Sequence, residues 1–261
     1  MLYCPIASGS KGNCHLIKGE DTIILIDAGT TAKNIIAQLD TLGVEPADVS
    51  GIFVTHEHID HISALDVLWR RHGIPVYCNL GTMEGIKKRF PALGSEAFRL
   101  FVSDEELIIN EFSLMPFRTP HDAAESVGYA VRCADKKLTV ATDIGYMTPN
   151  VYKNLQGAQL VALESNHDRD MLINGPYPFS LKRRIMGHSG HLSNEECACT
   201  LARLAENGLR QAVLCHLSQE NNTPTLASRT AERHLADVGC EGLPIDIAYQ
   251  EKRGAVYVIS P

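Results

Sequence analysis

The sequence predicts an α/β fold in which two β-sheets pack face to face and helices cover their outer sides, a four-layer αββα sandwich. Short strand-like runs occur in both halves of the chain, and helical patterns stand both between and after them. No stretch rich in glycine, serine or proline divides the sequence, and no repeat recurs at a fixed period. We therefore expect residues 1–261 to form a single domain.

The strands are predicted from short apolar or β-branched runs bounded by turn residues. In the first half of the chain they are residues 16–17, 22–26, 52–55, 76–78, 107–109 and 112–117. In the second half they are residues 127–133, 138–142, 160–163, 211–215, 245–248 and 256–259. The pattern leaves open how these strands pair.

Helices are predicted from apolar residues at helical spacing. They cover residues 31–42, 61–72, 82–90, 193–207 and 224–238. Two of them begin with recognisable caps. Ser193 is followed three residues later by Glu196, the spacing of a capping box, and Thr223 precedes Pro224 at a first helical turn.

Composition places the chain among ordinary globular proteins, because 44% of its residues are hydrophobic and 21% are charged. Its formal net charge of −7 argues against a protein that binds polyanions through a broad basic face. This argument does not apply to an enzyme whose bound metal ions supply positive charge at the phosphate.

Eight cysteines are scattered without a CxxC pair, so we expect them to be reduced and to pack as small hydrophobic residues. The first residues lack a basic segment followed by an apolar stretch, and no window approaches the roughly 18 uninterrupted apolar residues of a membrane span. These features predict a cytoplasmic protein that does not associate with membranes.

The segment 55–61, with the sequence THEHIDH, crowds three histidines and two carboxylates directly after the apolar run 51–54. Removing such side chains together from water is unfavourable unless a cation lies among them. The spacing of His56, His58, Asp60 and His61 therefore predicts a metal site.

Three further candidate ligands, His121, Asp143 and His216, each follow an apolar run. Loops at sheet ends are where a rigid scaffold places functional groups, so we expect these residues to converge with the 55–61 segment at one edge. The isolated histidines His15, His72 and His234 are interpreted as structural.

The THEHIDH segment resembles the HxHxDH signature of the metallo-β-lactamase fold superfamily, whose αββα sandwich carries a metal site at one sheet edge. The order of the remaining candidates agrees with that superfamily. The resemblance implies two divalent ions, the first bound by His56, His58 and His121, the second by Asp60, His61 and His216, and both bridged by Asp143. An aspartate at position 143 resembles hydrolases of phosphodiesters and thioesters, whereas β-lactamases with two zinc ions usually have cysteine there.

Four motifs resemble the YycJ/WalJ family of metallo-hydrolases, which is related to ribonuclease Z and is associated with exonuclease action on DNA. They are SGSKGN at 8–13, LESNHD at 163–168, GHLSN at 190–194 and HLSQENN at 216–222. The resemblance implies contacts with substrate from Ser8, Ser10, Asn13, Asn166 and His167. Two residues depart from the pattern: Ser126, where we expect proline, and His188.

The likeness to ribonuclease Z implies that His191 is a general acid and that Glu164 orients it, because a carboxylate partner favours a protonated imidazole. Two divalent ions would make a bridging hydroxide available for in-line attack on phosphorus, with Asp60 beside it. Arg183 and Arg184, in a run of three basic residues, are candidates for binding phosphate; a solvated helix face is the alternative interpretation.

The predicted function is hydrolysis of phosphodiester bonds in nucleic acid. The likeness to the YycJ/WalJ family implies a 5′-to-3′ exonuclease that acts on DNA, whereas the residues alone leave the polarity and the choice between DNA and RNA open. Nitrogen and oxygen ligands suit zinc, and they also accommodate manganese or iron(II). Two alternatives remain: a thioester hydrolase of the glyoxalase II type, and a regulatory metal-binding protein without turnover. The oligomeric state is left open.

Overall fold

Two seven-stranded sheets form the centre of the computed structural model, which describes residues 1–260. The first sheet contains, in spatial order, β14 (Tyr257–Val258), β1 (Leu2–Ala7), β2 (Cys14–Lys18), β3 (Ile23–Ile26), β4 (Val49–Phe53), β5 (Val76–Cys78) and β6 (Phe98–Leu100). The second sheet contains β13 (Ile245–Ile247), β12 (Gln211–Cys215), β11 (Leu160–Glu164), β10 (Lys136–Ala141), β9 (Val127–Cys133), β8 (Phe112–Arg118) and β7 (Leu107–Ile109).

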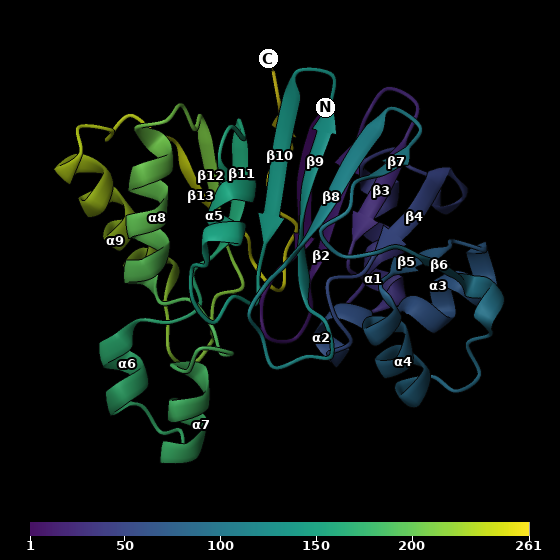
Figure 1. The fold of residues 1–261 in the computed structure, drawn as a ribbon, viewed down its shortest axis with the longest axis horizontal. Coiled ribbons are helices and arrows are strands. Elements are labelled where there is room, and N and C mark those ends of the chain that lie inside the picture. Colours follow the sequence, from purple (N-terminus) through teal and green to yellow (C-terminus); the bar gives the residue numbers. More distant parts are fainter. Residues whose placement is uncertain (261) are drawn as a thin grey trace.

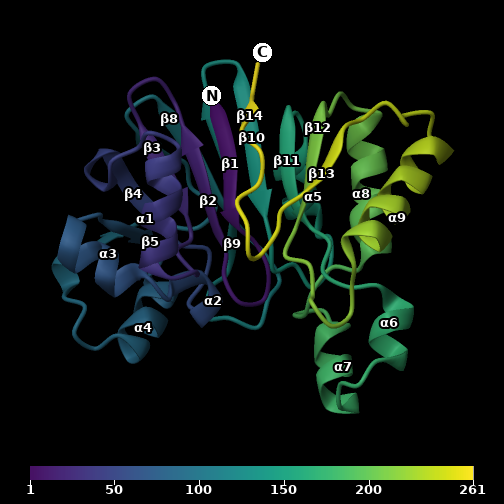
Figure 2. The same cartoon turned by 180° about the vertical axis from the view of Figure 1, so that it is seen from behind.

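Helices cover the outer face of each sheet, which confirms the predicted αββα sandwich (Figure 1; Figure 2 shows the same layers from behind). The first sheet is covered by α1 (Ala32–Thr41), α3 (Leu65–His72) and α4 (Leu80–Arg89), and the second by α5 (Pro149–Leu155), α8 (Asn194–Ala205) and α9 (Pro224–Asp237). Three short helices, α2 (Ile59–Ile62), α6 (Arg169–Asn174) and α7 (Phe179–Ile185), lie at one end of the sandwich. Two 3-10 turns, η1 (Pro46–Asp48) and η2 (Ser95–Ala97), complete the fold.

Alternation along the strands produces three apolar layers. In β3, Ile24 and Ile26 face the second sheet, whereas Ile23 and Leu25 pack under the first sheet's helices. Tyr129 of the second sheet donates a hydrogen bond of 2.6 Å from its hydroxyl to the carbonyl of Val54, so one polar contact ties the two sheets together where β4 ends.

The predicted strands and capped helices are present, with shifts of a few residues at their ends. Ser193 forms the expected capping box, and Thr223 caps α9 with Pro224 in its first turn. Strands β1 and β6 and helices α5, α6 and α7 are additions to the prediction. In β1 the residue Pro5 hides the strand pattern, and the ladder shifts register between Pro5 and Ala7 to accommodate it.

The predicted helix 61–72 is wrong as a single element, because it divides into α2 and α3. The Ser63 hydroxyl donates to the carbonyls of Gly29 and Thr30 at 2.6 and 3.0 Å, and the Ala64 amide donates to the Ala28 carbonyl. These bonds to the loop after β3 replace helical ones, which pins the THEHIDH segment against that loop. Within residues 1–260, no helix combines the length and apolar character that crossing a membrane requires.

Candidate metal centre

The predicted metal ligands meet at the end of the sandwich where β4, β8, β10 and β12 finish (Figure 1). β4 and β12 lead to His56 and His216, while β8 and β10 lead to His121 and Asp143. Their ligand-type atoms form groups in which all members lie within 4.8 Å of one another. Residues more than 150 positions apart in the sequence therefore share one pocket because strands of two sheets end at the same place.

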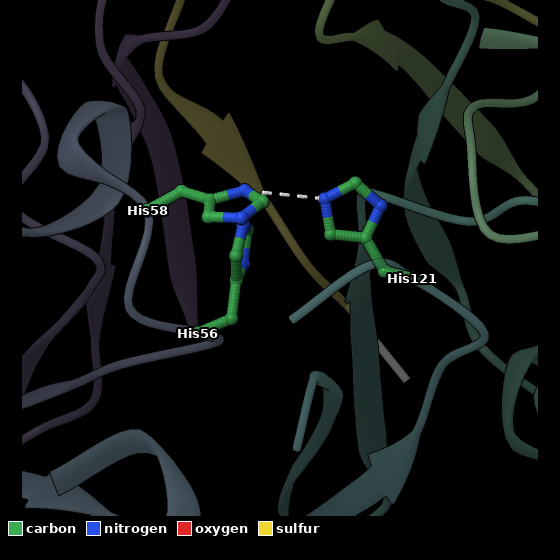
Figure 3. Close-up of side chains that lie close together, drawn as sticks. All are labelled: His56, His58 and His121. Carbon is green, nitrogen blue, oxygen red and sulfur yellow. Dashed lines mark hydrogen bonds between the residues drawn. The ribbon is translucent and has the colours of Figure 1, made fainter. Parts of the chain in front are cut away.

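The first group is His56, His58 and His121, which point toward one another in Figure 3. His121 Nε2 lies 3.3 Å from His58 Nδ1, and the ring centroids of His56 and His121 are 4.9 Å apart. Ligands at about 2.0–2.1 Å from a tetrahedral zinc stand about 3.3 Å from one another. His58 and His121 thus have the ligand spacing of one such ion, and the ligand atom of His56 lies within 4.8 Å of both.

Asp60, His61 and His216 form a second group, and Asp143 lies between the two. His61 Nε2 is 3.4 Å from Asp60 Oδ2 and 3.3 Å from Asp143 Oδ2. Asp143 Oδ1 is 3.7 Å from His121 Nε2, so its two oxygens face ligands of different groups. This placement is what a carboxylate that bridges two cations would need.

Buried polar atoms in this pocket are left without hydrogen bonds in the described part of the chain. They are His56 Nε2, Asp143 Oδ2 and His216 Nδ1, of which the last two face each other at 3.1 Å as an ion pair. An unsatisfied buried polar atom is costly, and so many are uncommon in one place. Imidazole nitrogens and carboxylate oxygens that are crowded together with few hydrogen bonds fit divalent cations such as zinc or manganese.

Charge in the pocket also calls for a cation. Burial alone would raise the pKa of Asp143, but the charges of His216 and His61 hold it well below its ordinary value. Burial lowers the pKa of His61, and this is overcome by Asp27, Asp143 and Asp60, which raise it well above its ordinary value. The lowered pKa values of Asp143 and Asp60 favour their ionised forms, and their charges favour a proton on His61 that metal binding would displace.

Asp27 is a functional candidate that the sequence analysis missed. Its Oδ2 lies 2.7 Å from His61 Nδ1, and its Oδ1 accepts a 2.8 Å bond from the Thr55 amide. Holding Nδ1–H in this way turns His61 Nε2 toward Asp60 and Asp143, 3.1 Å from the Asn13 side-chain nitrogen, which is the usual role of a carboxylate behind a metal-binding histidine. The signal was available, because Asp27 ends an apolar strand as Asp143 does.

Backbone strain marks the same residues. Asp27, Asp143 and His216 have φ of 61°, 58° and 54°, in the left-handed region that residues with a side chain rarely adopt. Each lies just after a strand of the sandwich. Such conformations cost about 1–3 kcal/mol each and concentrate at functional sites, where they aim side chains.

The predicted pair His191 and Glu164 is in contact. His191 Nδ1 lies 2.7 Å from Glu164 Oε1, and the other Glu164 oxygen accepts bonds from the amides of Ile144 and Leu192 at 2.8 and 3.1 Å. Burial lowers the pKa of His191, but Glu164, together with the charges of Asp143 and Asp60, more than offsets this and raises the pKa to about 9. A protonated His191 beside Asp143 is able to donate a proton into the pocket.

A hollow of about 170 Å³ opens beside His191. The residues that line it include Ser10, Asp122, Asn166 and Arg184, four of the ten in contact with it. Arg184 is held there by an ion pair with Asp122, the residue that follows His121. Arg183, its neighbour in α7, is exposed and does not line the hollow, so the structure brings one of the two predicted arginines to the site.

Other predicted substrate residues lie within the framework of the loops. The Asn13 side chain donates to the carbonyls of Gly9 and Asp60, and the Ser8 hydroxyl accepts a 2.9 Å bond from the His216 amide. His167 is buried, and that burial lowers its pKa to about 4. These contacts position the pocket; they do not place the three side chains in the hollow.

The two residues that depart from the family pattern differ in their surroundings. The buried Ser126 hydroxyl accepts a 2.9 Å bond from Thr119, closing the loop that carries His121. His188 is exposed at the edge of the Tyr146 ring, with ring centroids 5.0 Å apart.

Known proteins resemble this chain in sequence and in fold. Residues 22–217 match the family model described as "Beta-lactamase superfamily domain". The chain is 35% identical to exodeoxyribonuclease YycJ of Bacillus anthracis, over 91% of this chain and 90% of that protein. It is 33% identical to exodeoxyribonuclease WalJ of Streptococcus pneumoniae, over 90% and 88%.

Among solved structures, the metallo-β-lactamase fold protein YhfI from Bacillus subtilis superposes with a TM-score of 0.74 at 16% identity, covering 98% of this chain and 99% of that one. This likeness concerns the fold alone. Together the matches confirm the family predicted from the motifs, and the chain belongs to the metallo-β-lactamase superfamily and, within it, to the YycJ/WalJ family.

Proposed function

We propose that this protein is a metal-dependent exodeoxyribonuclease that hydrolyses phosphodiester bonds of DNA from the 5′ end. The observation that carries the proposal is the contact of His191 with Glu164 beside a cluster of candidate metal ligands. The relatives' names, YycJ and WalJ exodeoxyribonucleases, support the same substrate class.

The residues that would hold two divalent cations, zinc or manganese, are His56, His58 and His121 for one, Asp60, His61 and His216 for the other, and Asp143 for both. When bound, such cations lower the pKa of water and neutralise charge that develops on a phosphodiester. Asp27 would fix the ring of His61 through their 2.7 Å contact.

His191 would donate its proton to the leaving oxygen. Its pKa of about 9 keeps it protonated near neutral pH, and Glu164 fixes the ring through Nδ1. Thioester hydrolysis of the glyoxalase II type expels a thiolate, a weaker base than an alkoxide, and has less need of such an acid. The pair therefore favours the phosphodiesterase over that alternative.

Arg184 and Asn166 would contact the phosphate or the neighbouring backbone in the hollow. The Arg184 guanidinium is anchored on one side by Asp122, and about 60% of its side chain is exposed. Guanidinium groups bind phosphate through paired hydrogen bonds. Asn166 is itself fixed by its amide, which donates a 2.9 Å bond to the His216 carbonyl.

The test is digestion of 5′-labelled and 3′-labelled single- and double-stranded DNA and RNA, with added zinc or manganese. We expect cleavage of DNA from the 5′ end by the parent and none by His58→Ala. His72→Ala, on the outer helix α3, is the matched control and should cleave normally. Hydrolysis of an acyl thioester in place of nucleic acid would contradict the proposal, as would metal binding without turnover on any of these substrates.

A further inference from the structure

A second and larger hollow, of about 690 Å³, lies next to the candidate metal centre. We call it the Tyr249 groove. Ser8, Leu217, Ser218, Ile247, Tyr249 and Lys252 are among the residues that line it. Its volume falls in the range of about 300–1,000 Å³ that is usual for sites of small ligands.

The groove continues from the candidate centre. Ser218 lines both the groove and the smaller hollow beside His191. Ser8, in the groove wall, accepts the hydrogen bond from the amide of His216. A chain molecule with one phosphate at the metal centre would therefore extend into the groove without leaving the surface.

The lining of the groove combines apolar walls with a ring and a cation. Leu217 and Ile247 are partly buried, and 36% of the surface of Tyr249 is exposed. The Lys252 ammonium lies 4.0 Å from the centroid of the Tyr249 ring. Glu251 also lines the groove, and its carboxylate disfavours a ligand with many phosphates there.

The segment that carries Tyr249 is firmly attached. The side-chain oxygen of Gln250 accepts a 2.9 Å bond from the Lys11 amide, and the Ser8 amide donates to the Tyr249 carbonyl. Gly9 adopts φ of 153° against Gln250, where a Cβ atom would come within 3.0 Å of the glutamine side chain. The groove is thus preformed, which lowers the entropic cost of binding.

We propose that the Tyr249 groove binds the nucleotide next to the scissile phosphate of a single-stranded DNA end, with its base packed against the face of Tyr249 that Lys252 does not cover and its phosphate near Lys252. The inference rests on the proposed function and names the part of the substrate that this surface recognises. Stacking on an aromatic ring combined with a nearby cation is how proteins bind single strands without reading their sequence.

The experiment measures KM and kcat of the metal-loaded enzyme on a single-stranded DNA oligonucleotide and on bis(p-nitrophenyl) phosphate, which has no bases. Tyr249→Leu is expected to raise KM for the oligonucleotide about tenfold, the loss of one stacked base. Because the nitrophenyl rings of bis(p-nitrophenyl) phosphate can themselves pack on Tyr249, only kcat at saturating substrate is compared, and it should match that of the parent. Tyr249→Phe retains the ring and should restore the parent KM.

A second measurement is independent of turnover. The affinity for the same oligonucleotide, labelled with fluorescein and followed by anisotropy in chelator, should fall in Tyr249→Leu and not in Tyr249→Phe. For Lys252→Ala, the slope of log affinity against log salt should decrease by about 0.7, the contribution of one phosphate contact with a single strand. Lys136→Ala, at the start of β10 on the opposite end of the sandwich, is the matched control and should keep the parent slope.

The outcomes separate this inference from the function on which it rests. A parent that cleaves DNA, with unchanged KM, affinity and salt slope in Tyr249→Leu and Lys252→Ala, would overturn the groove assignment alone. A parent that binds DNA through Tyr249 but hydrolyses neither substrate would overturn the proposed function alone. If Tyr249→Leu does not fold, the salt slope of Lys252→Ala tests the inference by itself, because Lys252 is exposed.

Discussion

His191 Nδ1 lies 2.7 Å from Glu164 Oε1, and the Glu164 side chain has no exposed surface. Two backbone amides, of Ile144 and Leu192, hold the other carboxylate oxygen. A buried carboxylate satisfied on both oxygens is rigid, so the imidazole that it contacts is held in one orientation and one tautomer.

Removing the imidazole tests its role as the acid. His191→Ala is expected to lower kcat on DNA about 10²- to 10⁴-fold, the usual contribution of general acid–base catalysis, with the metal content unchanged. Steady-state kinetics and elemental analysis of the same preparation make the measurement. Turnover near the parent level with full metal content would show that His191 is not the acid.

Glu164→Gln should change the pH profile of kcat. Burial favours the neutral imidazole, and the carboxylate raises the pKa of His191 to about 9. Because the acid must be protonated, kcat of the parent should fall as pH rises through that pKa. Without the charge of Glu164 this decline should begin at a lower pH. An unshifted profile of kcat, measured on a DNA oligonucleotide whose leaving alkoxide needs a proton, would show that Glu164 does not set the pKa of His191.

Asp27→Asn should weaken metal binding. The variant keeps the size of the side chain but loses the charge that accepts from His61 Nδ1, so the affinity for zinc is expected to fall about 10- to 100-fold. Competition with a chromophoric chelator measures the affinity. Asp40→Asn, exposed on α1, should bind zinc as the parent does. Equal zinc affinities for both variants would show that Asp27 does not support metal binding.

Gly29→Ala should destabilise the protein strongly. A Cβ atom at Gly29 would lie 1.6 Å from the backbone oxygen of Asp60, and neither backbone segment can yield without displacing the site. We expect a loss of about 3 kcal/mol or more in the free energy of unfolding by urea. Gly242→Ala meets no atom within 4 Å and should change stability by less than about 0.5 kcal/mol. Similar losses in the two variants would refute the close approach.

Acid should destabilise the metal-free protein through His15. Burial lowers the pKa of His15 to about 3, while in the unfolded chain it titrates near its ordinary 6.5. Below pH 6.5 the unfolded chain binds the extra proton, so stability falls as pH falls toward 3, by about 1.4 kcal/mol per pH unit. Urea unfolding at pH 6.5, 5.5 and 4.5 should show a shallower decline for His15→Gln. Identical slopes in the two proteins would contradict this assignment.

Much of the site was predictable because its residues mark the ends of strands. The apolar runs before His56 and His216 indicated both the strands and the residues at which they end. Parallel strands of a sheet end at the same edge, so the side chains that follow them lie close together. The fold class followed from the same alternation, as Ile24 and Ile26 facing inward between Ile23 and Leu25 illustrate.

What the sequence concealed depends on contacts between distant segments. Helix 61–72 breaks because Ser63 bonds to the loop at Gly29, a tertiary contact that local pattern cannot reveal. Short helices such as α7 have too few residues for a clear periodicity. Arg183 and Arg184 are adjacent in the sequence, and helix geometry alone decided which of them faces the site.

Metal content is the most direct test of the central claim, that seven side chains hold a pair of divalent cations. After loading with zinc or manganese and removal of excess, inductively coupled plasma mass spectrometry should find two equivalents of metal per chain in the parent. Asp143→Ala should lose at least one of them, because Asp143 faces both ligand groups. A folded parent that retains no metal under these conditions would contradict the account.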